Sequence, residues 1–280
     1  VRELEGCCAS IDLSLDALRD KLDPIPPNAV RDSYFLHLAC SNEKVTLEII
    51  GFLLVAYPNA ASIGTTFFCP NKKTISYPLH LACANIDCPS SVIELLIHKY
   101  PSALGHVCSI ECDFLYVNTD DQECEEGMPL HYYLTRVSKV LDLAIIKILV
   151  DAYLTTAHDE DLFTPIHALL CNPDIDALFD ILQFLVESNP SSRRMTDGYD
   201  RAPLHIACYN KNITPRIVQM LLHIWPESIT HQDTSDKLPI HALCWNDNDE
   251  TVSVKILALL VEASPASAQH LDVYDMLPIH

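Results

Sequence analysis

One short motif recurs along the chain in a fixed register, and it constrains the fold more than any other feature. The motif is Pro followed by Leu or Ile and then His, and its histidines are His80, His131, His167, His205, His241 and His280. Phe35-Leu36-His37 is a seventh copy in which another residue replaces the proline. The intervals between the seven histidines are 43, 51, 36, 38, 36 and 39 residues. Such a period indicates one supersecondary unit stacked on copies of itself.

Each copy of the motif predicts a unit of two helices. The proline suits the first turn of a short helix, where a missing N–H costs no hydrogen bond, and an apolar segment of helical spacing follows about ten residues later. The expected second helices are Leu47–Tyr57, Ile93–Tyr100, Leu143–Tyr153, Leu178–Ser188, Ile217–Trp225 and Val254–Ser264. Most of them meet a proline that cannot continue a helix, at Pro58, Pro101, Pro190, Pro226 or Pro265. Thr214-Pro215 predicts an N-cap followed by proline at the first helical position.

Two copies of the motif resemble the Thr-Pro-Leu-His-x-Ala signature of ankyrin repeats, namely Thr164-Pro165-Ile166-His167-Ala168 and Ala202-Pro203-Leu204-His205-Ile206-Ala207. The segments before three copies are also similar to that family's hairpin tip, with Asp200, Asp236 and Asp275 in place of its turn glycine. Aspartate tolerates the left-handed backbone conformation that such a turn needs. TPR and HEAT repeats fit less well, because they lack a Pro-Leu-His helix start and an extended turn. The resemblance implies an all-α fold, an ankyrin-like helical repeat solenoid of helix-loop-helix units joined by extended hairpin-like turns, elongated and curved.

The repeats also predict how the chain is divided. We expect an N-terminal capping segment with a helix at residues 1–29 and a repeat array at 30–280, with about six repeats and a truncated seventh. An acidic, cysteine-containing insertion is expected at about 104–127. Because the chain begins on Val1 without a methionine and ends within a repeat, we expect further sequence on both sides. Further repeats, a leader, a membrane domain or a catalytic domain in that sequence stay open.

The charge of the chain argues against several classes of partner. Eighteen basic and 38 acidic residues give a net charge of −20 and a pI near 4.8. A nucleic-acid backbone and an anionic membrane surface would both repel such a protein, and no apolar run reaches the roughly 18 residues of a membrane span. We therefore expect a monomer that binds other proteins, including proteins with a basic surface. Acidity that serves only solubility is the alternative.

Four of the twelve cysteines, Cys40, Cys83, Cys208 and Cys244, lie three residues after a motif histidine. They are a whole repeat apart, which is too far for disulfides between them or for a shared zinc ion. We expect the histidine to hydrogen-bond the backbone near the turn and the cysteine to pack as a small apolar residue. The cysteines therefore predict a reduced, intracellular protein of the cytoplasm or nucleus, without a metal or other cofactor.

The insertion carries His106, Cys108, Cys112 and Cys124, whose spacing differs from that of standard zinc sites. A metal- or redox-responsive scaffold that uses these thiols is the alternative function. The acidic residues of the insertion lack the glycine and glutamate positions of an EF-hand, so we expect a solvated loop, with attraction of a basic partner as the alternative. No serine-hydrolase, phosphate-loop or zinc-protease motif occurs, and we do not expect an enzyme. His158, His231 and His270 recur nine or ten residues before a motif histidine and are expected to be structural, near the hairpin.

Ankyrin repeats usually hold ligands on a concave face made of hairpin tips and the exposed ends of the first helices. The resemblance therefore implies a non-catalytic protein–protein interaction scaffold. Carried over by position, the candidate partner-binding residues are Tyr199, Arg201, Tyr209, Asn210, Lys237, Trp245, Asn246 and Tyr274. Tyr, Trp and Arg among them are the residue types that dominate interface hot spots. The alternative is that Tyr209 and Trp245 pack between neighbouring helices.

Overall fold

The computed structural model describes residues 2–10, 13–19, 34–66, 75–108, 127–135, 141–156, 164–189, 194–245 and 250–279. The regular structure of these residues is helical, apart from two isolated antiparallel bridges that pair Thr65 with Ser76 and Cys108 with Gly127. The chain divides into two compact units. The N-terminal unit comprises residues 1–112 and 124–157, and the C-terminal unit comprises residues 113–123 and 158–280. The predicted all-α class is confirmed in each.

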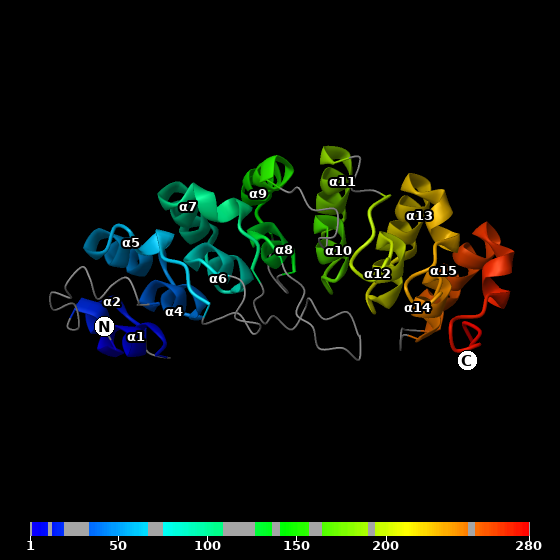
Figure 1. The fold of residues 1–280 in the computed structure, drawn as a ribbon, viewed down its shortest axis with the longest axis horizontal. Helices are drawn as coiled ribbons and strands as arrows, with labels where there is room; N and C mark the ends of the chain where they lie inside the picture. The colour runs from blue at the N-terminus through cyan, green and yellow to red at the C-terminus, as the bar shows by residue number, and fades with distance from the viewer. Residues whose placement is uncertain are drawn as a thin grey trace. The chain divides into compact units, whose positions relative to one another are not determined.

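The described part of the N-terminal unit contains three helix pairs. The first helices of the pairs are α4 (Phe35–Ser41), α6 (Pro78–Ala84) and α8 (Pro129–Leu134), and the second helices are α5 (Leu47–Ala56), α7 (Ser90–Lys99) and α9 (Leu143–Thr156). Two short helices, α1 (Arg2–Cys8) and α2 (Leu15–Arg19), precede the pairs, and the 3-10 helices η1 (Ala60–Ser62) and η2 (Pro101–Gly105) follow α5 and α7. Within this unit the first helices form one row and the second helices another (Figure 1).

The C-terminal unit repeats the same arrangement. Its first helices in the described range are α10 (Pro165–Leu170), α12 (Pro203–Tyr209) and α14 (Pro239–Trp245), and its second helices are α11 (Phe179–Ser188), α13 (Pro215–Ile224) and α15 (Glu250–Ala263). The 3-10 helices η4 (Pro226–Thr230) and η5 (Pro265–Gln269) follow α13 and α15. In Figure 1, α10 and α12 lie below α11 and α13.

Proline sets both ends of these helices. The helices α6, α8, α10, α12 and α14 each begin at the motif proline, as predicted. The helices before Pro58, Pro101, Pro226 and Pro265 end one residue earlier than expected, because the residue preceding a proline is forced out of the helical region. Tyr100, for example, has φ −146° and ψ 76°. The 3-10 helices at or just after these prolines were not predicted from the sequence.

The predicted N-cap at Thr214 is correct in position but not in chemistry. Thr214 precedes Pro215, the first residue of α13, yet its side chain makes no capping hydrogen bond. Its hydroxyl instead donates to Asp176 Oδ1 at 2.9 Å, across to the preceding repeat. The hydroxyl therefore joins two repeats.

Small side chains line the contacts between successive first helices, which pack on one another within each unit. Ala39, Ala82 and Ala207 are fully buried, and so are the cysteines that follow them, Cys40, Cys83 and Cys208. The predicted packing role is confirmed for these three cysteines. It is wrong for Cys244, which is exposed near the end of α14. No helix within the described ranges is both long and apolar enough to cross a membrane.

Candidate functional site

Three hairpin tips of the C-terminal unit, at residues 197–201, 233–237 and 272–276, share one geometry. In each tip the backbone N–H of the first residue, an aspartate, donates to the carbonyl of the fifth at 3.0 to 3.1 Å. The Oδ1 atom of that aspartate accepts the N–H groups of the third and fifth residues at 2.8 to 3.0 Å. The fourth residues, Asp200, Asp236 and Asp275, have φ angles of 56°, 55° and 57°. The prediction that aspartate takes the left-handed position of the family's glycine is confirmed.

Backbone and histidine contacts join the tips to one another. Thr234 N–H donates to Tyr199 O at 3.0 Å, and the next pair of tips repeats this contact. His231 Nε2 lies 2.9 Å from Asp200 O, and His270 Nε2 lies 2.9 Å from Asp236 O. A carbonyl oxygen only accepts, so Nε2 is the donor in both contacts. The predicted structural role of these two histidines is confirmed, whereas His158 lies outside the described residues.

Four of the motif histidines connect their first helix to the segment that follows in the next repeat. His205 Nδ1 accepts the N–H of Ala202 at 3.1 Å, and its Nε2 donates to Lys237 O at 3.0 Å. The same Nε2 contact joins His37 to Ser76, His80 to His106 and His167 to Arg201, at 3.1, 2.8 and 3.0 Å. Backbone N–H groups donate likewise to Nδ1 of His80, His131 and His241. These contacts fix the Nε2-protonated tautomer, in which one ring nitrogen donates and the other accepts.

Burial keeps these imidazoles neutral. The side chains of His37, His80, His167 and His205 are almost completely buried, and burial lowers the pKa of each to about 4. At neutral pH each ring therefore donates one hydrogen bond without bringing a charge into the core. The structural role predicted for the motif histidines is confirmed at the six described positions, and His280 lies outside them.

An asparagine after the first helix also joins neighbouring repeats, a role that was not predicted from the sequence. Asn85 Nδ2 donates to Cys40 O and Asn42 O at 2.8 and 2.9 Å, and Asn210 Nδ2 donates to Leu170 O and Asn172 O at 2.7 and 2.8 Å. Asn42 Nδ2 contacts Cys8 O and Ser10 O in the same way, at 3.1 and 2.8 Å. The recurring signal was present in Cys40-Ser41-Asn42, Cys83-Ala84-Asn85 and Cys208-Tyr209-Asn210.

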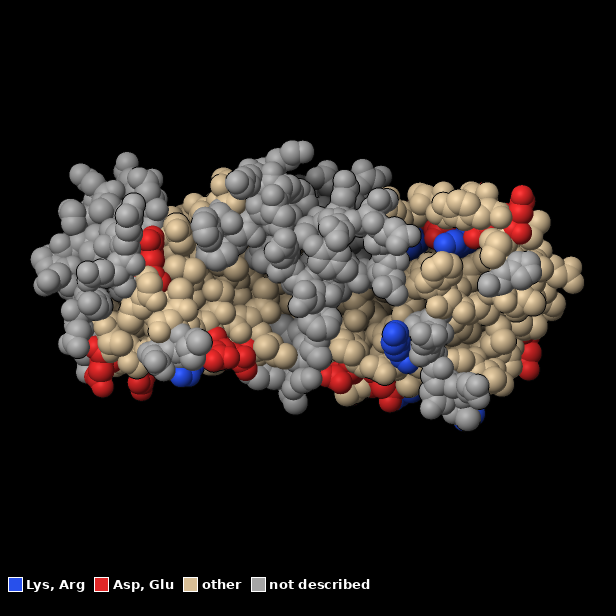
Figure 2. Space-filling view, turned by 90° about the horizontal axis from the view of Figure 1, so that it is seen from below, with Lys and Arg blue, Asp and Glu red and all other residues tan. Residues whose placement is uncertain are grey.

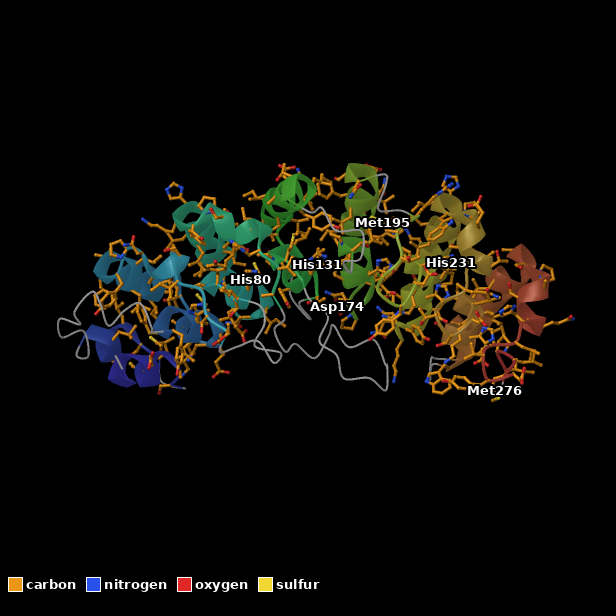
Figure 3. The ribbon with its side chains drawn as sticks, in the orientation of Figure 1. His80, His131, Asp174, Met195, His231 and Met276 are labelled. Carbon is orange, nitrogen blue, oxygen red and sulfur yellow. The ribbon has the colours of Figure 1, made fainter. Side chains whose placement is uncertain are left out.

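Two aromatic side chains near the last two tips are strongly exposed. Trp245 and Tyr274 each leave 72% of their surface accessible. Lys237 Nζ lies 5.1 Å from the centre of the Trp245 ring. Tyr209 is half-buried, and burial is the main cause that raises its pKa to about 12. Trp245 therefore does not pack between helices, whereas Tyr209 partly does. In Figure 3, Met276 of the last tip lies at the lower edge of this unit, below His231.

Neither a family model nor a curated protein sequence matches this chain. Among solved structures, the ankyrin repeat domain of human ASB11 is similar over 88% of this chain and 90% of that one, with a TM-score of 0.50. The chain has the ankyrin-repeat fold. The two sequences are 16% identical, so the similarity concerns the fold alone. The binding residues must be sought on this chain's own surface.

Within the ankyrin-repeat fold, two of the candidate residues act inside the protein. The Arg201 side chain is buried, and its Nε and Nη2 atoms each lie 2.7 Å from Asp197 Oδ2. Releasing it toward a partner would leave a buried carboxylate without its counter-ion, which is costly. Asn210 uses both amide hydrogens on the preceding repeat. The remaining candidates form what we call the tip surface: Tyr199, Tyr209, Lys237, Trp245 and Tyr274. Asn246 lies outside the described residues.

The thiols of the predicted insertion are only partly described, because Cys112 and Cys124 lie outside the described residues. Cys108 is buried, its Sγ lies 3.9 Å from Tyr132 Oη, and its carbonyl accepts the Tyr132 hydroxyl at 2.5 Å. His106 is exposed and accepts a hydrogen bond from His80 through its carbonyl. Among the residues with described positions, no group of three or more potential ligands could hold a metal ion.

Proposed function

We propose that this chain is a non-catalytic protein–protein interaction scaffold that binds a partner protein through the tip surface, on the concave side of its repeats. The observation that carries the proposal is the exposure of Trp245 beside the hairpin tips. Burial of an exposed indole is favourable, because it removes a large apolar area from water. Trp and Tyr are also the side chains that most often dominate the energy of protein interfaces.

The tip surface is presented on a rigid backbone. The Asp233 side chain accepts the N–H of Lys237, and the His205 ring donates to the carbonyl of the same residue. Asp272 holds the Tyr274 backbone in the equivalent way, through a hydrogen bond of 2.9 Å. A surface whose backbone is already ordered loses less conformational entropy on binding than a flexible loop would. This favours recognition by the tips.

The charge of the chain supports a partner with a basic surface. The net charge is −20, and a negative field draws basic proteins and repels nucleic acid and anionic membranes. We propose that the scaffold acts as a monomer in the cytoplasm or nucleus, where the buried cysteines serve as small apolar residues.

Affinity capture from cell extract, followed by mass spectrometry, tests the proposal. We expect Trp245→Ala combined with Tyr274→Ala to abolish capture of the partner found with the unmodified chain. Thermal unfolding followed by circular dichroism should shift by only a few degrees, since surface substitutions usually change stability by about 0.5 kcal/mol or less. Val254→Ala, at an exposed position on α15, is the matched control and should capture normally. Unchanged capture by the double variant would refute a partner site at the tips.

A further inference from the structure

One aromatic ring of the tip surface is open to solvent on a fixed support. Trp245 is the last residue of α14, and its counterpart one repeat earlier, Tyr209, is half-buried. Lys237 Nζ lies 5.1 Å from the centre of the Trp245 ring. Hydrogen bonds to Asp233 and from His205 hold the backbone of Lys237 on both sides. The indole therefore already attracts one cation, and most of its surface stays accessible.

The tip that carries Lys237 and the tip that follows it are rich in acidic residues. The tips at 233–237 and 272–276 contain four aspartates and one lysine, which is a local charge of −3 (−4 + 1). Asp233 and Asp272 are buried and accept backbone N–H groups of their own tips, whereas Asp236 and Asp275 are exposed. Burial disfavours the charged form of Asp272, but the backbone N–H groups and the charge of Lys237 outweigh it, and the pKa is lowered. The local field therefore favours a basic ligand.

The layout of these groups suits an extended ligand. Val273 N–H donates to Ser235 O at 3.1 Å, so the last two tips are direct neighbours. Packed helices lie about 8–10 Å apart, and we expect a similar spacing, about 10 Å, between the equivalent residues Asp236 and Asp275 of successive tips. In the right-hand, C-terminal part of Figure 2, most of the visible face is uncharged, with Asp and Glu atoms mainly near its borders and a few Lys or Arg atoms among the uncharged ones.

We propose that this surface binds an extended, arginine-containing segment of a partner protein. Two arginines of the segment pair with Asp236 and Asp275, and one of these guanidinium groups stacks on Trp245. Arginine fits better than lysine, because its planar guanidinium stacks on aromatic rings and pairs with a carboxylate through two hydrogen bonds. Residues three apart in an extended chain are separated by about 10 Å, so arginines with two residues between them match the two carboxylates. The inference rests on the proposed function of the tip surface.

A fluorescence titration tests this directly. The chain has two tryptophans, so Trp225→Phe leaves Trp245 as the only indole. The probe is a blocked peptide of sequence Gly-Arg-Leu-Thr-Arg-Gly, and we expect it to change the Trp245 emission in a saturable, salt-sensitive manner. Replacing both arginines with lysine should weaken binding by at least about fivefold, or roughly 1 kcal/mol. Replacing both with glutamate should abolish it. Equal binding of the arginine and lysine peptides, or no binding of the arginine peptide, would overturn the proposal.

Charge variants locate the site. Asp236→Asn with Asp275→Asn should weaken the arginine peptide by at least about tenfold and flatten its salt dependence, since two carboxylate pairs are lost. Asparagine tolerates the left-handed conformation, so the tips should keep their fold. Asp200→Asn, at the same position one tip away, is the matched control and should bind normally. Equal weakening by the control would overturn the assignment. If Trp245→Ala with Tyr274→Ala abolishes partner capture while the peptide never binds, only this inference fails and the proposed function stands.

Discussion

Acid should destabilise this protein through its buried histidines. His37, His80, His167 and His205 have a pKa of about 4 in the folded chain, because burial disfavours the charged ring, and the ordinary histidine pKa of 6.5 when the chain is unfolded. Between these two values the unfolded chain binds protons that the folded chain does not. The stability contributed by the neutral rings is thus fully present above pH 6.5 and is lost as the pH falls toward 4.

The expected effect is large for a marginally stable protein. A lowering of the pKa from 6.5 to about 4 corresponds to roughly 3 kcal/mol for each histidine once the pH is below both values. At pH 5 the loss is roughly 2 kcal/mol for each ring. His37 and His80 lie in the N-terminal unit and His167 and His205 in the C-terminal unit, so each unit loses about 4 kcal/mol at pH 5, against a typical total of about 5–15 kcal/mol.

Substitution of one histidine isolates the contribution of that residue to the pH dependence of stability. Glutamine can still donate to the carbonyl of Lys237 from the place of Nε2 but does not titrate, so His205→Gln should reduce the pH slope of the free energy of unfolding by about 1.2 kcal/mol per pH unit near pH 5.5. Both tryptophans, Trp225 and Trp245, lie in the C-terminal unit, so urea unfolding followed by their fluorescence reports on the unit that contains His205. His223→Gln, at an exposed position on α13, is the control. An unchanged pH slope of the free energy of unfolding in His205→Gln would refute the conclusion that the His205 ring is buried and neutral.

Three further experiments test the repeat contacts and the thiols. Asp236→Gly should leave stability near the unmodified value and Asp236→Ala should lower it by about 1 kcal/mol in urea unfolding, because alanine is strained in the left-handed conformation. Asn210→Ala should cost about 1–3 kcal/mol in the same assay, because it leaves two carbonyls of the preceding repeat without donors. Lys211→Ala, at the exposed next position, is the control and should cost less than about 0.5 kcal/mol. In the folded protein at pH 8, alkylation mapped by mass spectrometry should modify Cys244 and spare Cys208. Burial raises the pKa of the Cys208 thiol and blocks access of the reagent. Comparable modification of both cysteines would contradict the packing of Cys208.

The sequence was sufficient for features that depend on a residue and its near neighbours. Proline in the first turn marks the start of the short helices, and proline after the second helices marks their end. The proline ring fixes its own φ angle and keeps the preceding residue out of the helical region. Asp236 and its counterparts were correctly expected in the left-handed conformation for the same local reason. The period of the motif then implied the repeat architecture, since every unit buries its surface against the next.

Only the tertiary structure decided which side chains stay free for a partner. Arg201 and Asn210 occupy positions that look like surface positions in the sequence, but one pairs with buried Asp197 and the other hydrogen-bonds the preceding repeat. Trp245, by contrast, is left exposed at the end of α14. Asn210 depends on carbonyls that the preceding repeat supplies, and Arg201 depends on the fold of its own tip, which brings its side chain to Asp197 four residues earlier. The sequence by itself therefore determined the repeat, and contacts in the folded chain decided which candidate side chains are exposed.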